Sequence, residues 1–201
     1  MSGTFLEQAQ QFNPEVLESF KRLVATGRVE ILSSPYHHSL AFFYSLQEFE
    51  TQIELHRQAI RRIFGVETRV LANTELAYND QLAKWAENHD FSGVLAEGWD
   101  PILDWRSPNY VYRPSGTEKI GLLLKNYRLS DDLAFRFSNR NWNGWPLTAE
   151  KFNAWAMDSL QHAPLLNLFM DYETFGEHQW SETGISLVRS EERRVGKECR
   201  S

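Results

Sequence analysis

The stretch that decides the fold is Pro-Leu-Leu-Asn-Leu-Phe-Met-Asp-Tyr-Glu-Thr-Phe-Gly-Glu-His, residues 164–178. It begins with a mostly apolar run, residues 165–170, that stops at Asp171. Such a run is typical of a strand buried on both faces, as in a parallel sheet covered by helices. In barrels built from such strands, the active site lies at the carboxyl ends. The pattern leaves two interpretations of Asp171 equally open: an acid–base role, or a cap of the following turn, which aspartate commonly provides.

A second carboxylate follows another predicted strand. Residues 69–74 form a short strand pattern, and Glu75 and a group of aromatic and amide side chains come directly after it. Paired carboxylates at strand ends suit glycoside cleavage, in which one acts on the anomeric carbon and the other protonates the leaving oxygen. The alternative interpretation is that both carboxylates are structural.

The rest of the chain alternates strands with helices, which predicts an α/β fold with a parallel sheet. The remaining strands are expected at residues 28–34, 91–96 and 119–126. Helices are expected to begin at Asn13-Pro14, to span residues 46–64 with Gly65 at the end, and to begin again at Asn79 and Thr148, with Ser130 as a further N-cap.

Size and charge restrict the class of protein. The 201 residues, 42% of them hydrophobic, suit one domain with a real core, at the low edge of the length of a complete (β/α) barrel. A net charge of −6 argues against a nucleic-acid partner. No apolar run approaches the roughly 20 residues that span a bilayer, and no signal peptide is visible, so we expect a cytoplasmic protein without a membrane partner. The lone Cys199 excludes an intrachain disulfide and a cysteine metal cluster.

Several ordered motifs resemble glycoside hydrolase family 57, in particular its α-amylase-like branch. The three longest are Ala-Asn-Thr-Glu-Leu-Ala-Tyr at residues 72–78, Met-Asp-Tyr-Glu-Thr-Phe-Gly-Glu-His at 170–178, and Val-Glu-Ile-Leu-Ser-Ser-Pro-Tyr-His-His-Ser at 29–39. Shorter matches lie at residues 97–100, 105–110 and 129–132, and the similarity runs from about residue 2 to about residue 187.

The resemblance implies a partial (β/α)7-type barrel with parallel strands, incomplete at its N-terminal edge. We expect residues 1–188 to form this partial catalytic barrel. Residues 189–201 are charged, have no apolar period and resemble translated adaptor sequence, so we expect them to be disordered. No cofactor and no metal are implied, and the implied partner is an α-glucan polysaccharide or oligosaccharide.

The resemblance also implies a retaining mechanism on α-1,4-glucans, with Glu75 as the nucleophile and Asp171 as the general acid/base. Hydrolysis and transfer by a 4-α-glucanotransferase or branching enzyme would share the same covalent intermediate. Substrate contacts are implied for nine further residues, His37, His38, Trp99, Asp100, Trp105, Arg106, Asp131, Glu173 and His178. The two adjacent histidines could instead bind a carboxylate or lie in solvent, and the loop aromatics could be structural.

Two rival functions stay open. A metal-dependent polysaccharide deacetylase can use a similar incomplete barrel, but it needs histidine and aspartate ligands that converge on one ion, and the sequence contains no His-x-x-x-His pair. A carbohydrate-binding or inactive fragment is the non-enzymatic alternative.

Overall fold

The computed structural model describes residues 1–175, 178 and 179, and the chain forms two compact units. The first unit contains Met1–Glu97 and Val111–Leu123. The second contains Gly98–Tyr110 and the described residues from Leu124 onward. Each unit is described by itself below.

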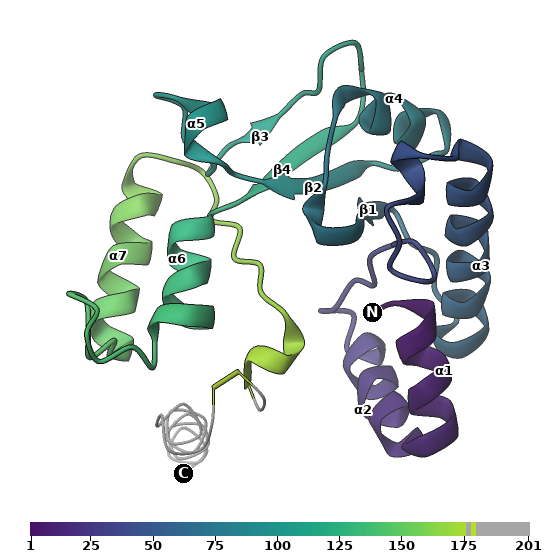
Figure 1. Ribbon diagram of the computed structural model, residues 1–201, viewed down its shortest axis with the longest axis horizontal. Coiled ribbons are helices and arrows are strands. Elements are labelled where there is room, and N and C mark those ends of the chain that lie inside the picture. Colours follow the sequence, from purple (N-terminus) through teal and green to yellow (C-terminus); the bar gives the residue numbers. More distant parts are fainter. Residues whose placement is uncertain (176–177, 180–201) are drawn as a thin grey trace. The chain divides into compact units, whose positions relative to one another are not determined.

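Three helices form one side of the first unit: α1 (Gly3–Phe12), α2 (Pro14–Ala25) and α3 (Leu46–Phe64) (Figure 1). The predicted start of α2 and the predicted start and end of α3 are confirmed. Gly65 ends α3 in the left-handed conformation, with φ of 70°, which a residue without a Cβ adopts at little cost. The sequence reasoning did not predict α1. The helices enclose a buried apolar cluster of Leu6, Ala9, Leu17, Ile31, Tyr36, Ala59 and Ile60.

A four-stranded sheet in the order β1-β2-β4-β3 lies beside these helices (Figure 1). Its strands are β1 (Val70–Ala72), β2 (Gly93–Glu97), β3 (Val111–Tyr112) and β4 (Gly121–Lys125). Strands β1 and β2 are parallel, as predicted, and α4 (Asp80–Asn88) connects them. The Asn79 side chain caps α4 by accepting the backbone N–H of Leu82. The α/β fold class is confirmed, whereas the antiparallel pairing of β3 with β4 was not predicted.

The strand predicted at residues 28–34 is reduced to a single bridge. Ser33 pairs in parallel with Leu71: its N–H donates to the Val70 carbonyl at 2.8 Å, and its carbonyl accepts from Ala72 at 2.9 Å. Pro35 follows two residues later and has no N–H with which to continue the ladder. The segment therefore lies alongside β1, and the loop that follows it leaves from the same edge of the sheet as the loop after β1.

The second unit is mostly helical. Its elements are α5 (Asp100–Leu103), α6 (Tyr127–Asp131), the π-helical turn η3 (Asp132–Arg136), α7 (Ala149–Gln161) and the 3-10 turn η4 (Tyr172–Phe175). Two shorter 3-10 turns, η1 (Ala41–Phe43) and η2 (Thr74–Leu76), belong to the first unit. Helix α7 begins after its predicted N-cap Thr148. The N-cap predicted at Ser130 is wrong, because Asn126 caps α6 and Ser130 lies inside that helix.

The strand predicted at residues 165–170 is also wrong. The segment has no regular secondary structure and no strand ladder, and Leu168 within it is 39% exposed. The carbonyl of Asn167 accepts the backbone N–H of Asn126 at 2.8 Å, and the side-chain amide of Asn167 donates to the Leu124 carbonyl at 3.1 Å. The Asn167 side chain thus occupies the Leu124 carbonyl, an acceptor at the end of β4 that the backbone of a neighbouring strand would use. The backbone pairing between β4 and this segment therefore does not continue.

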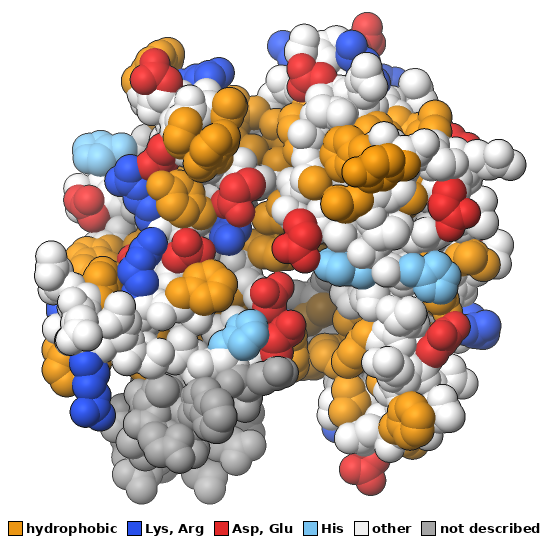
Figure 2. Space-filling view, in the orientation of Figure 1, with side chains coloured by type: hydrophobic (Ala, Val, Ile, Leu, Met, Phe, Trp, Pro, Cys, Tyr) orange, Lys and Arg blue, Asp and Glu red, His pale blue; other side chains and the backbone are white. Residues whose placement is uncertain are grey.

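Acidic, basic and apolar side chains are interspersed on the face shown in Figure 2. Within the described part of the chain, no helix is both long and apolar enough to cross a membrane. The tail predicted to be disordered, residues 189–201, lies outside the described residues.

Candidate active site

Glu75 lies in a backbone conformation that a glutamate rarely adopts. It follows the carboxyl end of β1 inside η2, with φ of 54°, and Leu76 after it has φ of 53°. Left-handed conformations of residues other than glycine cost on the order of 1–3 kcal/mol and cluster at functional sites, where the surrounding structure holds them. The Glu75 side chain is 78% exposed. The strained turn therefore presents a carboxylate to solvent at the carboxyl end of a parallel strand.

His38 is the residue that meets this carboxylate. Its Nε2 lies 2.9 Å from Oε1 of Glu75, and its own φ is also 54°. The two loops are joined a second time where the Thr74 hydroxyl donates to the Ser39 carbonyl at 2.7 Å. Of the alternatives for the histidine pair, carboxylate binding is thus found for His38, while His37 is exposed and its ring makes an edge-to-face contact with Tyr36.

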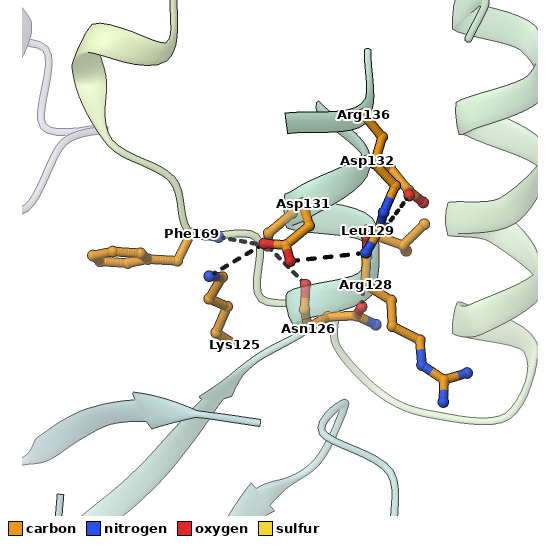
Figure 3. A network of polar contacts seen from close by, with 9 residues as sticks. Lys125, Asn126, Arg128, Leu129, Asp131, Asp132, Arg136 and Phe169 are labelled. Atoms are coloured by element: carbon orange, nitrogen blue, oxygen red, sulfur yellow. Dashed lines mark hydrogen bonds and ion pairs between the residues drawn. The ribbon is translucent and has the colours of Figure 1, made fainter. Parts of the chain in front are cut away.

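Asp171 lies in the second unit, directly before η4, and is exposed. Its backbone carbonyl accepts the N–H of Thr174 at 3.1 Å, which starts the turn. The segment that leads to it is held at Phe169, whose N–H donates to the buried Ser130 hydroxyl at 3.1 Å (Figure 3).

Two of the predicted substrate-binding aspartates already have cationic partners. Asp100 accepts the hydroxyl of Tyr127 at 3.0 Å and forms an ion pair with Arg128. The contacts with Tyr127 and Asp100 raise the pKa of Arg128 above its ordinary value. Asp131 lies between Lys125, at 3.6 Å, and Arg136, at 3.8 Å (Figure 3). Both carboxylates are therefore oriented by neighbouring side chains.

The loop after β2 exposes two indole rings. Trp99 is 56% exposed and Trp105 is 86% exposed. Arg106 holds this loop, because its guanidinium donates to the carbonyls of Leu103 at 3.0 Å and Ile102 at 2.8 Å. The arginine thus satisfies carbonyls at the end of α5, and the flat tryptophan faces are left open to solvent.

Glu173 and His178 are both exposed, and the backbone N–H of His178 donates to the Glu173 carbonyl at 3.2 Å. Of the predicted site residues, the first unit contains Glu75, His37 and His38, and the second unit contains Trp99, Asp100, Trp105, Arg106, Asp131, Asp171, Glu173 and His178. Across the described residues, no group of three or more histidine, cysteine, aspartate or glutamate side chains is arranged to hold a metal ion.

Sequence reasoning missed several residues that shape these loops. Thr74 and Gln52 hold the His38 loop. Asn126 caps α6 directly after β4, and Arg128 forms an ion pair with Asp100. Gln52 had a detectable signal, since it is a polar residue on the apolar face of α3 beside Phe49.

Known proteins resemble this chain over most of its length. The sequence profile of Glycosyl hydrolase family 57 matches residues 1–198. A Methanocaldococcus jannaschii protein named "Putative alpha-amylase" is 50% identical over 186 residues, which are 92% of this chain and 39% of that protein. The chain therefore spans about two fifths of the length of this curated relative.

Two solved structures share the fold. The alpha-amylase AmyC from Thermotoga maritima matches 92% of this chain and 49% of its own, with a TM-score of 0.62 and 15% identity. The 4-alpha-glucanotransferase from Thermococcus litoralis matches 88% of this chain and 33% of its own, with a TM-score of 0.59 and 16% identity. The profile match over residues 1–198 establishes that the chain belongs to glycosyl hydrolase family 57.

Proposed function

We propose that this chain carries the catalytic residues of a retaining glycoside hydrolase that acts on α-1,4-glucans. One observation carries the proposal: an exposed glutamate, Glu75, occupies a strained turn at the carboxyl end of β1 and is hydrogen-bonded to His38. Family membership and the alpha-amylase name of the 50% identical relative support the substrate class.

In this mechanism an oxygen of Glu75 attacks the anomeric carbon while the bond from that carbon to the leaving oxygen breaks. Asp171 gives its proton to the leaving oxygen. In the second step Asp171 takes a proton from water, the water oxygen attacks the anomeric carbon, and the ester bond breaks to return the Glu75 carboxylate. The mechanism requires the two carboxyl groups to lie about 5–5.5 Å apart in the catalytic complex.

The remaining site residues are proposed to bind the glucan. The open faces of Trp99 and Trp105 suit stacking on sugar rings, because these rings present apolar C–H faces. Polar contacts to sugar hydroxyls are proposed for the other candidates, His37, Asp100, Arg106, Asp131, Glu173 and His178.

A 4-α-glucanotransferase is the second candidate. The fold likeness to the Thermococcus litoralis enzyme favours it, and the exposed Trp105 offers a surface on which an acceptor sugar could stack. Transfer uses the same glycosyl–enzyme ester and differs only in whether water or a sugar hydroxyl attacks it.

The test is activity of the full-length protein on soluble starch and maltooligosaccharides. Glu75→Ala and Asp171→Asn should each lower the rate by several powers of ten, whereas Glu67→Gln, a change in a surface ion pair with Arg61, should not. Added azide should restore turnover to Glu75→Ala and yield a glycosyl azide of inverted anomeric configuration. Transfer would appear as products longer than the starting oligosaccharide.

Two results would contradict the proposal. Glu75→Ala with the wild-type rate would exclude Glu75 as the nucleophile. Release of acetate from an acetylated polysaccharide, abolished by a metal chelator, would favour the deacetylase alternative instead.

A further inference from the structure

We infer that Gln52, a buried amide on α3, is a positioning residue for the Glu75 carboxylate and acts through the loop of residues 37–39. The inference rests on the proposed function, because it assigns Gln52 a part in holding the nucleophile of that mechanism.

Gln52 binds the loop on both sides of His38. Its side chain is buried, with the residue 4% exposed. Its Oε1 accepts the backbone N–H of His37 at 3.2 Å and the hydroxyl of Ser39 at 2.9 Å. One oxygen atom therefore fixes the residue before His38 and the residue after it.

Glu48 sets the orientation of the Gln52 amide. The Nε2 of Gln52 donates to Oε1 of Glu48 at 2.7 Å, one helical turn earlier. An ionised carboxylate can only accept hydrogen bonds, so the NH2 group must face Glu48 and the oxygen must face the loop. Glu48 itself lies in the first turn of α3, where its N–H donates to the capping side chain of Ser45. The start of the helix thus fixes which end of the amide meets the loop.

The loop passes this constraint to Glu75. His38 has φ of 54°, a conformation that persists in a non-glycine residue only where neighbours hold it. Its Nε2 contacts Oε1 of Glu75 at 2.9 Å, and Ser39 is tied to Thr74 at 2.7 Å. With Oε1 held by His38, the other carboxylate oxygen, Oε2, is the one that attacks. Burying a polar side chain without hydrogen bonds is costly. The positioning role accounts for the glutamine at this core position of α3.

The same helix contains a matched control. Gln58 donates its amide to Glu54 at 2.9 Å, with the same four-residue spacing as Gln52 and Glu48. Gln58 is exposed, so Gln58→Met removes the same kind of helical pair without touching the loop.

The first experiment compares Gln52→Met with Gln58→Met in the full-length protein on maltooligosaccharides. Gln52→Met should lower kcat about 10- to 100-fold, the loss typical of a misplaced catalytic group, with KM changed less than about threefold. Gln58→Met should keep kcat within about twofold. A wild-type kcat in folded Gln52→Met overturns the inference.

A reversed pair tests whether the acceptor oxygen matters. Gln52→Glu alone places two carboxylates one turn apart and should lower kcat. Glu48→Gln/Gln52→Glu lets the amide on residue 48 donate to the carboxylate on residue 52, whose second oxygen can still accept from the loop, so kcat should return to within about threefold of wild type. This pair decides the inference if Gln52→Met does not fold, and failure of the rescue in folded protein overturns it.

A double-mutant cycle with His38→Ala separates this role from general destabilisation. If Gln52 acts through His38, adding Gln52→Met to His38→Ala should not lower kcat further, whereas independent effects would multiply. Amide hydrogen exchange gives a readout without activity: the His37 N–H should exchange faster in Gln52→Met than in wild type or Gln58→Met. Unchanged exchange overturns the inference.

The outcomes distinguish this inference from the proposed function. Wild-type activity in Glu75→Ala removes the proposed function whatever Gln52 does. An inactive Glu75→Ala together with a fully active Gln52→Met removes only the role of Gln52.

Discussion

Oε1 of Glu87 accepts the backbone N–H of Lys119 at 2.5 Å. The same oxygen accepts the N–H groups of Glu118 at 2.9 Å and Ile120 at 3.1 Å. Glu87 lies in the last turn of α4, and these three residues lead into β4. A single carboxylate oxygen thus fixes the entry of β4 against α4. The hydrogen bond from Lys119 is the largest of the effects that lower the pKa of Glu87 below its ordinary value.

Replacing Glu87 should destabilise the fold in a pH-dependent way. Because the pKa of the Glu87 carboxyl is lower in the folded protein, its contribution is complete above the ordinary glutamate pKa, near 4.5, and is lost as the pH falls through the folded value. Glu87→Gln should therefore lower the melting temperature at pH 7, and the gap to wild type should narrow below pH 4.5. Thermal unfolding of both proteins from pH 3 to pH 7 measures this. A gap that stays constant would mean that the charge of Glu87 contributes nothing.

The buried His56 should cause a second loss of stability on acidification, at a higher pH than the loss caused by Glu87. The side chain is fully buried on α3, its Nε2 lies 2.9 Å from the Met1 carbonyl, and burial lowers its pKa to about 4. In the unfolded chain His56 is protonated as the pH falls through about 6.5, whereas in the folded chain it stays neutral until about pH 4. Unfolding therefore takes up a proton in that window, and stability should fall on acidification by up to about 3 kcal/mol, at 1.36 kcal/mol per pKa unit.

His56→Phe separates this effect from that of Glu87. The substitution removes the titrating group, so the melting temperature should depend less on pH between 6.5 and 4, while the fall below pH 4.5 caused by Glu87 persists. An unchanged slope between pH 6.5 and pH 4 would show that His56 is not the group responsible.

The parts of the fold that the sequence predicted are those set by local chemistry. Helix α3 begins after Ser45, whose side chain accepts the Glu48 N–H, and ends at Gly65 with a positive φ. Both signals lie within a few residues of the helix end that they determine. The strand predicted at residues 165–170 was wrong because strand formation depends on partners that are distant in the sequence. The apolar character of these residues says nothing about ladder partners, and the Leu124 carbonyl is taken by the side chain of Asn167, 43 residues away in the sequence.

The same distinction applies to the candidate site. Motif resemblance pointed to Glu75 and to the histidine pair, but it could not choose between His37 and His38. That choice depends on the positive φ of His38, which turns its ring toward a carboxylate 37 residues away. Gln52 was missed because its partners, the His37 N–H and the Ser39 hydroxyl, are 15 and 13 residues away in the sequence.

A methyl group at Gly98 should disturb the carboxyl end of β2. A Cβ built there would overlap the carbonyl oxygen of Lys125 and would lie 2.8 Å from the Pro108 Cβ. Gly98→Ala should lower the free energy of unfolding by about 1–3 kcal/mol, as overpacking does. Gly93, at the other end of β2, is the matched control, because its Cβ would meet only ordinary contacts with the nearest atom, on Val70, at 3.5 Å.

Urea denaturation measures both glycine variants. Gly93→Ala should stay within about 0.5 kcal/mol of wild type or be slightly more stable, since alanine restricts the unfolded chain. Equal midpoints of urea denaturation for the two variants would contradict a close approach of the Gly98 and Lys125 backbones.

Ser130 links α6 to the segment that carries Asp171, so replacing it should affect both stability and activity. Its hydroxyl is fully buried, donates to the Asn126 carbonyl at 2.7 Å and accepts the Phe169 N–H at 3.1 Å. In Ser130→Ala the Asn126 carbonyl still accepts the Ser130 backbone N–H, but the Phe169 N–H loses its acceptor. An unsatisfied donor of this kind costs about 1–3 kcal/mol.

Ser159→Ala is the control, because its hydroxyl makes the same four-residue bond within a helix, to the Trp155 carbonyl at 3.0 Å. We expect Ser159→Ala to change the unfolding free energy by less than about 0.5 kcal/mol, as surface substitutions do. Because Phe169 lies two residues before Asp171, Ser130→Ala should also lower kcat on maltooligosaccharides, whereas Ser159→Ala should not. If Ser130→Ala loses stability but keeps its kcat, Ser130 contributes to folding alone and does not help to place the general acid/base.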